Sequence, residues 1–170
     1  MEIIKIGIEW ARAELVSTSF FVLTGLLFVL CSLGLWEFGK TDLARSYFIP
    51  LLVSGAFLMT VGFGLFFNNK SRISRFESIQ QIEVSAFIQA ERSRVDATLK
   101  EYQNIVFTGI PIILMICAGV LFFVDLPIWR ASMVSSIAML AIILLIDGMA
   151  HARIEVYKQA LELAHQNLMP

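Results

Sequence analysis

Three ionisable side chains near the end of the last apolar run are spaced for shared chemistry. His151 follows Asp147 by one helical turn and Glu155 follows by another, so a helix would place all three on one face. A carboxylate with a pKa raised by partial desolvation, next to a histidine, is typical of a proton or cation site. The alternative, which we prefer, is a solvated Asp147 that anchors the helix at the headgroup level and pairs with Arg153, His151 or a lysine of another helix.

A second pair, Glu162 and His165, has the E-x-x-H spacing that supplies metal ligands in ferritin-like bundles. Such centres need two of these motifs and further glutamates, whereas the whole chain has 2 histidines. We therefore predict neither a metal nor a cofactor, and we interpret the pair as part of a solvated helix face. Cys31 and Cys117 lie inside apolar runs, where a thiol behaves as a small hydrophobic side chain.

Common catalytic and nucleotide-binding motifs are missing from the sequence. It contains no G-x-x-x-x-G-K-[ST] phosphate loop, no G-x-G-x-x-G, no H-E-x-x-H and no G-x-S-x-G. A net charge of -1 also gives no global basic field of the kind that attracts nucleic acid. These features argue against a nucleophilic enzyme of a common kind and against nucleic acid as a partner.

The composition determines the elements that must position these residues. Of the 170 residues, 58% are hydrophobic and 16% are charged, which is too apolar for a water-soluble domain of this length. Four runs approach the roughly 20 apolar residues that cross a lipid bilayer as a helix, namely 18–36, 47–67, 105–124 and 131–146. Because backbone amides inside hydrocarbon must be satisfied locally, such long unalternating runs favour helices over barrel strands. We predict an all-α integral membrane protein with four transmembrane helices.

Lysine and arginine are distributed unevenly around the predicted spans. The segments before the first span, between the second and third spans, and after the fourth span hold ten of these residues, whereas the two short connections hold three. The positive-inside rule therefore places both termini and the long middle connection in the cytoplasm. We expect a multi-pass protein of a cell inner membrane.

Helical extensions are predicted on the cytoplasmic side. Residues 1–17 have the pattern of an amphipathic helix, which either lies in the interface plane or continues the first span. No Pro or Gly interrupts residues 65–108, so the segment 68–103 is predicted to form a helical hairpin with its bend at 78–83. We predict that this hairpin and the four spans together form one bundle, residues 18–149.

The tail, residues 150–170, repeats this design. It is predicted to continue the fourth span as a helix to about Gln166, with an apolar stripe formed by Ile154, Tyr157, Leu161 and Leu168. The apolar positions of the middle hairpin need a partner surface, and the tail stripe is the one that we expect them to contact.

Small residues recur at four-residue intervals in two of the predicted spans. Ala56, Thr60 and Gly64 do so in the second span, and Ser132 and Ser136 do so in the fourth. Each set forms a ridge along which helix backbones can approach closely. Such ridges serve contacts within one bundle as readily as contacts between subunits, and the sequence favours neither.

The sequence leads to three ranked hypotheses of function. The first is a non-enzymatic, oligomeric membrane protein with a cytoplasmic helical bundle, acting as a pore, a sensor or a docking platform. In span number and orientation alone, it is similar to several large-pore channel families. The second is a small membrane enzyme or transporter that uses Asp147, His151 and Glu155 at the inner membrane surface. The third is a structural accessory subunit. The expected partners are the lipid bilayer and either further copies of the chain or another membrane protein.

Overall fold

The computed structural model describes residues 2–78 and 84–167, and these residues are helical except at short connections. The long helices are α1 (Glu2–Phe38), α3 (Phe48–Glu77), α4 (Val84–Glu101), α5 (Ile110–Phe123) and α6 (Pro127–Gln166). A short helix, α2 (Asp42–Ser46), precedes α3, and a π-helix, η2 (Tyr102–Gly109), joins α4 to α5. The described residues contain no strand, and the predicted all-helical fold is confirmed.

Four helical stretches are long and apolar enough to cross a bilayer. They are α1, α2 with α3, α4 with η2 and α5, and α6, and each contains one of the four predicted runs except that the third run extends one residue beyond Phe123. The 40 residues of α6 give it a length of about 60 Å, roughly twice the thickness of the hydrocarbon core. A large part of each stretch must therefore lie outside the hydrocarbon if it spans a membrane.

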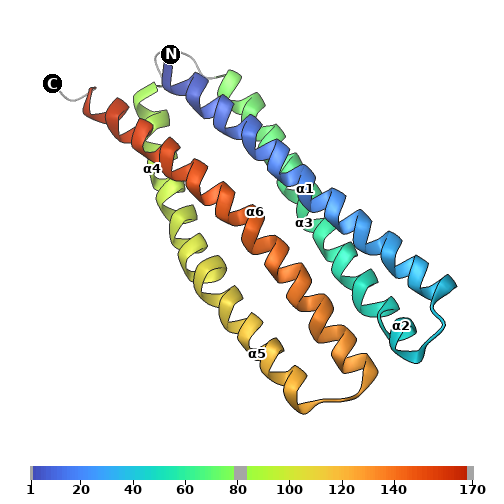
Figure 1. Cartoon of the computed structure of the whole chain (residues 1–170). Coiled ribbons are helices and arrows are strands. Elements are labelled where there is room, and N and C mark those ends of the chain that lie inside the picture. Colours follow the sequence, from blue (N-terminus) through green and yellow to red (C-terminus); the bar gives the residue numbers. More distant parts are fainter. Residues whose placement is uncertain (1, 79–83, 168–170) are drawn as a thin grey trace.

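The helices form two hairpins, α1 with α3 and the continuous stretch α4–η2–α5 with α6 (Figure 1). The start of α1, the end of α3, the start of α4 and the end of α6 lie at one end of the molecule, which we call the charged end. The opposite, loop end carries α2 and the α5–α6 connection. Within the described chain, α6 contacts all the other helices, whereas α5 contacts α6 and η2 alone. The fold is therefore organised around α6.

Glycines allow α1 and α3 to approach each other closely. A Cβ atom added to Gly55 would lie 2.7 Å from the carbonyl oxygen of Gly25, and one added to Gly62 would lie 2.8 Å from Cγ2 of Val22. Such distances leave no room for a side chain, so the contact requires glycine. Towards the loop end, Ser32 Oγ donates a hydrogen bond of 2.6 Å to the carbonyl oxygen of Phe48 at the start of α3.

The small-residue ridges singled out in the sequence lie outside this contact. Ala56, Thr60 and Gly64 are exposed on α3, and a Cβ atom added to Gly64 would have no atom within 4 Å. Ser132 and Ser136 are half-buried on α6. A role of these ridges between subunits stays a prediction.

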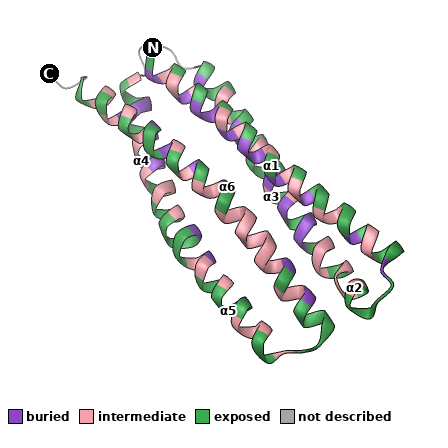
Figure 2. Ribbon diagram, in the orientation of Figure 1, coloured by how far each residue is buried: buried purple, intermediate pink, exposed green. Residues whose placement is uncertain are grey.

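The main apolar core lies at the charged end (Figure 2). It combines residues of α1, α3, α4 and α6, namely Ile3, Trp10, Ala11, Phe76, Phe87, Ile88, Val95, Ile154, Tyr157 and Leu161. The predicted packing of the tail stripe against the middle hairpin is thus confirmed for its three described members. A smaller core of Phe21, Leu58 and Ile146 joins α1, α3 and α6 within the predicted spans.

The helical extensions have the predicted lengths. Residues 2–17 continue the first span as part of α1, which decides between the two arrangements that their pattern left open. The second span extends to Glu77, and α6 ends at Gln166 as expected. The predicted bend begins with Ser78 at the C-terminus of α3, but its residues 79–83 lie outside the described residues, as does Leu168.

The π-helix was not predicted. The sequence, which has no Pro or Gly over residues 65–108, indicated an ordinary helix in this segment, and Pro111 lies two residues after the π-helix ends. Proline has no N–H to donate, and its ring displaces the carbonyl group four residues earlier, which favours the wider π turn just before it. Accordingly, the N–H of Ile110 bonds to the carbonyl oxygen of Ile105, five residues back. Thr108 Oγ1 likewise donates a hydrogen bond of 2.9 Å to the carbonyl oxygen of Gln103.

Candidate functional site

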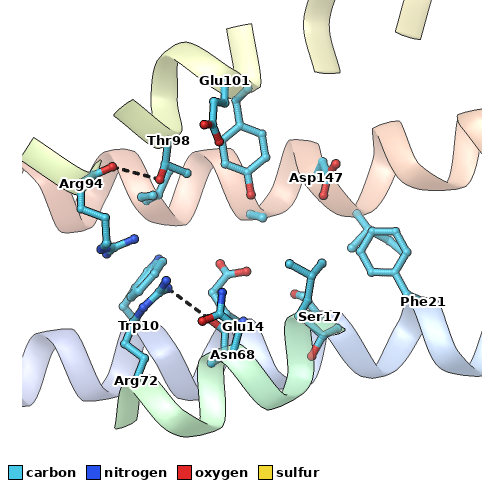
Figure 3. A pocket seen from close by; sticks show the side chains of 17 residues that line it. Trp10, Glu14, Ser17, Phe21, Asn68, Arg72, Arg94, Thr98, Glu101 and Asp147 are labelled. Atoms are coloured by element: carbon cyan, nitrogen blue, oxygen red, sulfur yellow. Dashed lines mark hydrogen bonds between the residues drawn. The ribbon is translucent and has the colours of Figure 1, made fainter. Parts of the chain in front are cut away.

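A polar pocket lies between the two hairpins, on the side of the charged end, where the predicted apolar runs stop. Its cavity has a volume of about 230 Å³ and walls from α1, α3, α4, η2 and α6. Its polar lining residues are Trp10, Glu14, Ser17, Thr18, Asn68, Asn69, Arg72, Arg94, Thr98, Glu101, Tyr102 and Asp147 (Figure 3). The pocket therefore combines acidic and basic side chains in one space.

The polar residues of α1 reach the pocket through a heptad-like repeat. Buried positions of this helix alternate at intervals of three and four residues, in the order Ile3, Gly7, Trp10, Glu14, Ser17, Phe21 and Gly25. Such a repeat keeps one seam of a helix against its neighbours. Glu14 and Ser17 occupy seam positions although they are polar, and this was the signal in the sequence that could have revealed them.

Glu14 connects α1 to α6 through a buried ion pair. Glu14 is 8% exposed, and its Oε1 accepts a hydrogen bond of 3.0 Å from Nε of Arg153. The same guanidinium donates through Nη2 to Ser17 Oγ at 2.6 Å. Arg153, which the sequence offered as a partner for Asp147, pairs with Glu14 instead.

A second buried carboxylate, Glu91 on α4, neutralises Arg94. Glu91 is 1% exposed and accepts two hydrogen bonds through Oε2, of 3.0 Å from Nε and 2.6 Å from Nη2 of Arg94. Nη2 of Arg75 lies 3.8 Å from its other oxygen. The charge of Arg94 is therefore compensated outside the cavity that its side chain lines.

Arg72 has no comparable partner. Its Nη1 donates a hydrogen bond of 3.1 Å to Oδ1 of Asn69, and no carboxylate in the described part of the chain lies within ion-pair distance. Its guanidinium lies over the ring of Trp10, 5.2 Å from the ring centroid, and that of Arg94 lies at 5.0 Å. Burial lowers the pKa of Arg72, and the nearby charge of Arg94 lowers it further.

The indole of Trp10 adds an unused donor beside Arg72. Its Nε1 is buried, and within residues 2–78 and 84–167 it has no acceptor. The ring is fixed in place because it stacks on Tyr157, with centroids 5.1 Å apart and planes 7° apart. This end of the pocket thus carries a positive charge that no carboxylate of the described residues pairs with, next to an N–H group that has no acceptor there.

Asp147 occupies the opposite end of the pocket (Figure 3). It is half-buried, and no basic side chain of the described residues forms an ion pair with it. Tyr102 of η2 also lines the cavity; burial raises the pKa of its hydroxyl group, and the charges of Asp147 and Glu14 raise it further. The pocket is therefore polarised, with a cationic end and an acidic end.

His151 and Glu155 lie in a different groove. The ring of His151 is edge-on to those of Tyr102 and Phe107, with centroid distances of 5.7 Å and 4.9 Å. Its Nε2 is 3.8 Å from Oε1 of Glu155, and both residues line a surface groove between α4 and α6. Asp147 thus lines the pocket, whereas His151 and Glu155 line this groove, and the proton or cation site formed by all three stays a prediction.

The E-x-x-H pair has ordinary surroundings at the end of α6. Oε1 of Glu162 is 3.9 Å from Nζ of Lys158, and His165 belongs to the last helical turn. In the part of the chain that the structure describes, no group of three or more His, Cys, Asp or Glu side chains is arranged to hold a metal ion. Cys31 and Cys117 are free thiols, the first exposed and the second buried.

Comparisons with protein-family models, with curated proteins and with solved structures gave no match for this chain. The class of this protein is therefore described from its fold and its pocket alone. It is an all-helical chain with four candidate membrane spans and a polarised pocket where the apolar runs end. Any assignment of function must be argued from that pocket.

Proposed function

We propose that this protein is a non-enzymatic membrane sensor. A small molecule from the cytoplasm binds in the pocket at the inner membrane surface and changes how the two hairpins pack. The helical bundle that projects into the cytoplasm then changes shape. The observation that carries this proposal is the polarised pocket, because its walls come from both hairpins and a ligand inside it contacts both.

The position of the pocket supports access from the cytoplasm. Thr18, Leu65 and Ile146 line its membrane side and lie at the inner ends of three predicted spans. The charged lining residues lie beyond those ends, and Asn68 and Glu101 at its rim are exposed. In the predicted topology, a water-soluble molecule reaches this pocket without entering hydrocarbon.

The helix connections support the transmission of a signal. From the pocket to the charged end, α1 and α6 continue without interruption into the main apolar core. A ligand that prefers one packing of the hairpins shifts the population towards that packing by its difference in affinity. Continuous helices then carry the shift to the tip of the bundle, where a partner membrane protein or a further copy of the chain can respond.

The competing hypotheses have less support. In a single chain the small core of Phe21, Leu58 and Ile146 lies on the membrane side of the pocket, so a pore would need several copies around an axis. The hypothesis of an enzyme or transporter needed Asp147 and His151 in one site, and they line separate cavities. An accessory subunit remains an alternative that the sensor test also addresses.

The test measures the distance between the hairpins beside the pocket. Spin labels at the exposed positions Lys70 of α3 and Lys100 of α4, in a chain with Cys31 and Cys117 replaced by alanine, report that distance in nanodiscs by electron double resonance. The probe is a protein-free small-molecule extract of cytosol, compared with buffer of equal pH and ionic strength. A sensor shows a saturable change in distance, and an unchanged distance contradicts the proposal.

A pair of variants connects that change to the pocket. Ala150, 4% exposed, lines the pocket, so Ala150→Phe fills it and should abolish the response to the extract. Ala152 is exposed on the same helix and lies outside the pocket, so Ala152→Phe should respond like the unmodified chain. Recording in planar bilayers adds a separate check, since ion currents that the extract opens would favour the pore.

A further inference from the structure

We infer that the pocket binds a small zwitterion, in which a short chain joins a carboxylate or phosphate to an ammonium group. This inference deepens the proposed function and rests on it, because it names the class of ligand that the sensor recognises. It is carried by the arrangement of charges inside the cavity, which we argue from its two ends.

The cationic end suits an anionic group. Arg72 uses one of its guanidinium N–H groups for Asn69 and has no carboxylate partner among the described residues. The guanidinium groups of Arg72 and Arg94 both lie over the ring of Trp10, so two positive charges gather at this end. A planar guanidinium binds carboxylate and phosphate through two parallel hydrogen bonds. An anion here compensates a half-buried charge that the protein leaves unpaired.

The acidic end suits an ammonium group. Asp147 has no ion pair in the described chain, and the carboxylate of Glu14, between the two ends, is already occupied by Arg153. A simple anion at Arg72 would leave Asp147 unpaired, and a simple cation at Asp147 would leave Arg72 unpaired. One neutral molecule with both charges satisfies both ends, because buried charges are stabilised when they are paired.

The dimensions of the pocket limit the size of the ligand. Trp10 at the cationic end and Ser17 near the acidic end are seven residues apart on α1, which corresponds to about 10 Å along the helix axis. After allowing about 3 Å for a hydrogen bond at each end, the two charges of the ligand are about 4 Å apart. The cavity of about 230 Å³ is also below the roughly 300–1,000 Å³ of pockets for drug-sized molecules.

The direction of the charges favours a free molecule over a lipid headgroup. Asp147 directly follows the fourth predicted span, whereas Trp10 precedes the first span by eight residues, so the cationic end lies farther from the hydrocarbon. Phosphatidylethanolamine has the opposite order, with its phosphate nearer the hydrocarbon than its ammonium group. A free zwitterion can turn to match the pocket.

Calorimetric titration of the full chain in phosphatidylglycerol nanodiscs tests the inference. The probes are γ-aminobutyrate and phosphoethanolamine as zwitterions, ethanolamine as the cation alone and inorganic phosphate as the anion alone. We expect at least one zwitterion to bind about tenfold or more tightly than both single-charge probes. Equal binding of ethanolamine or phosphate would overturn the inference. Nanodiscs that contain phosphatidylethanolamine should leave the affinity unchanged, and competition by that lipid would assign the pocket to a headgroup.

Variants at the two ends identify the residues that bind each charge. Arg72→Gln and Asp147→Asn should each weaken zwitterion binding by about 10- to 100-fold, since each removes a charged hydrogen-bond partner. Arg72→Lys and Asp147→Glu keep the charges and should retain part of the affinity, which guards against a loss of folding. Lys70→Gln, an exposed position on α3, is the matched control and should bind normally. Unchanged affinity in both neutral variants would place the ligand elsewhere.

The two proposals fail in different ways. If no zwitterion binds but the cytosolic extract still changes the distance between the Lys70 and Lys100 labels, the ligand class is wrong and the sensor stands. If a zwitterion binds at Arg72 and Asp147 but the distance stays constant, the ligand class is right and the sensor is wrong.

Discussion

At the scale of single residues, the pocket depends on how its buried charges are neutralised. The carboxylates of Glu14 and Glu91 are almost fully buried, and each accepts hydrogen bonds from the guanidinium group of an arginine. Removing one partner of such a pair leaves an uncompensated buried charge, which costs more than the pair itself contributes. Arg72 and Asp147 line the pocket as half-buried charges that have no ion pair in the described part of the chain.

We predict that Arg153→Met lowers the free energy of unfolding by about 3–5 kcal/mol, because Glu14 then stays buried without a partner. Adding Glu14→Gln should recover much of this loss, since the uncompensated charge is removed. Reversible unfolding in detergent micelles measures both effects. Arg130→Met is the control, because its partner Asp125 is 99% exposed in its side chain and the loss should stay below about 1 kcal/mol. Similar losses for both arginines would contradict the role of burial.

The sequence identified part of this site. Asp147 stood out because it ends an apolar run, and the structure places it in the pocket. Arg72 and Arg94 could not be linked to Trp10, because they meet it only after three helices have packed together. Glu14 was detectable in principle from its place in the heptad-like repeat, but its charge resembled that of a surface residue.

At the scale of helices, the spacing of apolar residues predicted more of the structure than it did at the scale of the site. The ends of α3 and α6 and the contact between the tail and the middle hairpin followed from apolar spacing and, for α3, from the lack of Pro and Gly after Gly64. The π-helix did not follow, because the spacing of side chains does not reveal whether a backbone N–H bonds four or five residues back. The glycine contact was also missed, since the sequence shows small residues but not which face meets a neighbour.

We predict opposite effects for two glycines of α3. Gly55→Ala should destabilise the protein by about 1–3 kcal/mol, because its Cβ would clash with the backbone of Gly25. Gly64→Ala should stabilise it by up to about 1 kcal/mol, because alanine favours the helix and nothing lies within 4 Å. Unfolding in detergent distinguishes the two. A stabilising Gly55→Ala would mean that α1 and α3 are not in backbone contact.

Removing residues 152–170 should expose α4 to proteolysis. The tail contributes Ile154, Tyr157 and Leu161 to the main core, and without them α4 loses most of its partner surface. Trypsin should then cleave faster after Arg92 and Lys100 than in the full chain. A chain with Val156→Ser, an exposed position on α6, controls for a general loss of tail hydrophobicity. Equal cleavage in the full and shortened chains would show that α4 is protected by other contacts.

At the scale of the whole molecule, the start of α1, the end of α3, the start of α4 and the end of α6 lie at one end. The predicted topology, in which these helix ends share the cytoplasmic side of the membrane, stays a prediction. A cysteine at Thr41, next to α2 at the loop end, should react with an impermeant maleimide added to intact cells. A cysteine at Ser85, on the first turn of α4, should react only after lysis. Both experiments need a chain without Cys31 and Cys117. The reverse pattern would place the pocket on the other side of the membrane.

The assembly state is a further question at this scale. Because α5 contacts α6 and η2 alone within the described chain, most of its apolar surface faces outwards, as does the ridge of Ala56, Thr60 and Gly64 on α3. We expect copies of the chain to associate through small residues, since these let helix backbones approach in lipid. Mass measurement in nanodiscs should show an oligomer that Thr60→Leu weakens and Ser136→Leu does not. A monomer for the unmodified chain would exclude association and, with it, the pore.

The short apolar run of α6 also makes the pocket responsive to the thickness of the membrane. Residues 131–146 cover about 24 Å as a helix, less than the roughly 30 Å of an average hydrocarbon core. The bilayer must thin around α6 or cover the residues that follow the run, the first of which is Asp147. In a thicker bilayer, hydrocarbon reaches the acidic end of the pocket, while Arg72 stays in water. For the proposed sensor, ligand affinity should therefore fall as acyl chains lengthen, and lipid composition would then adjust the concentration range of its response.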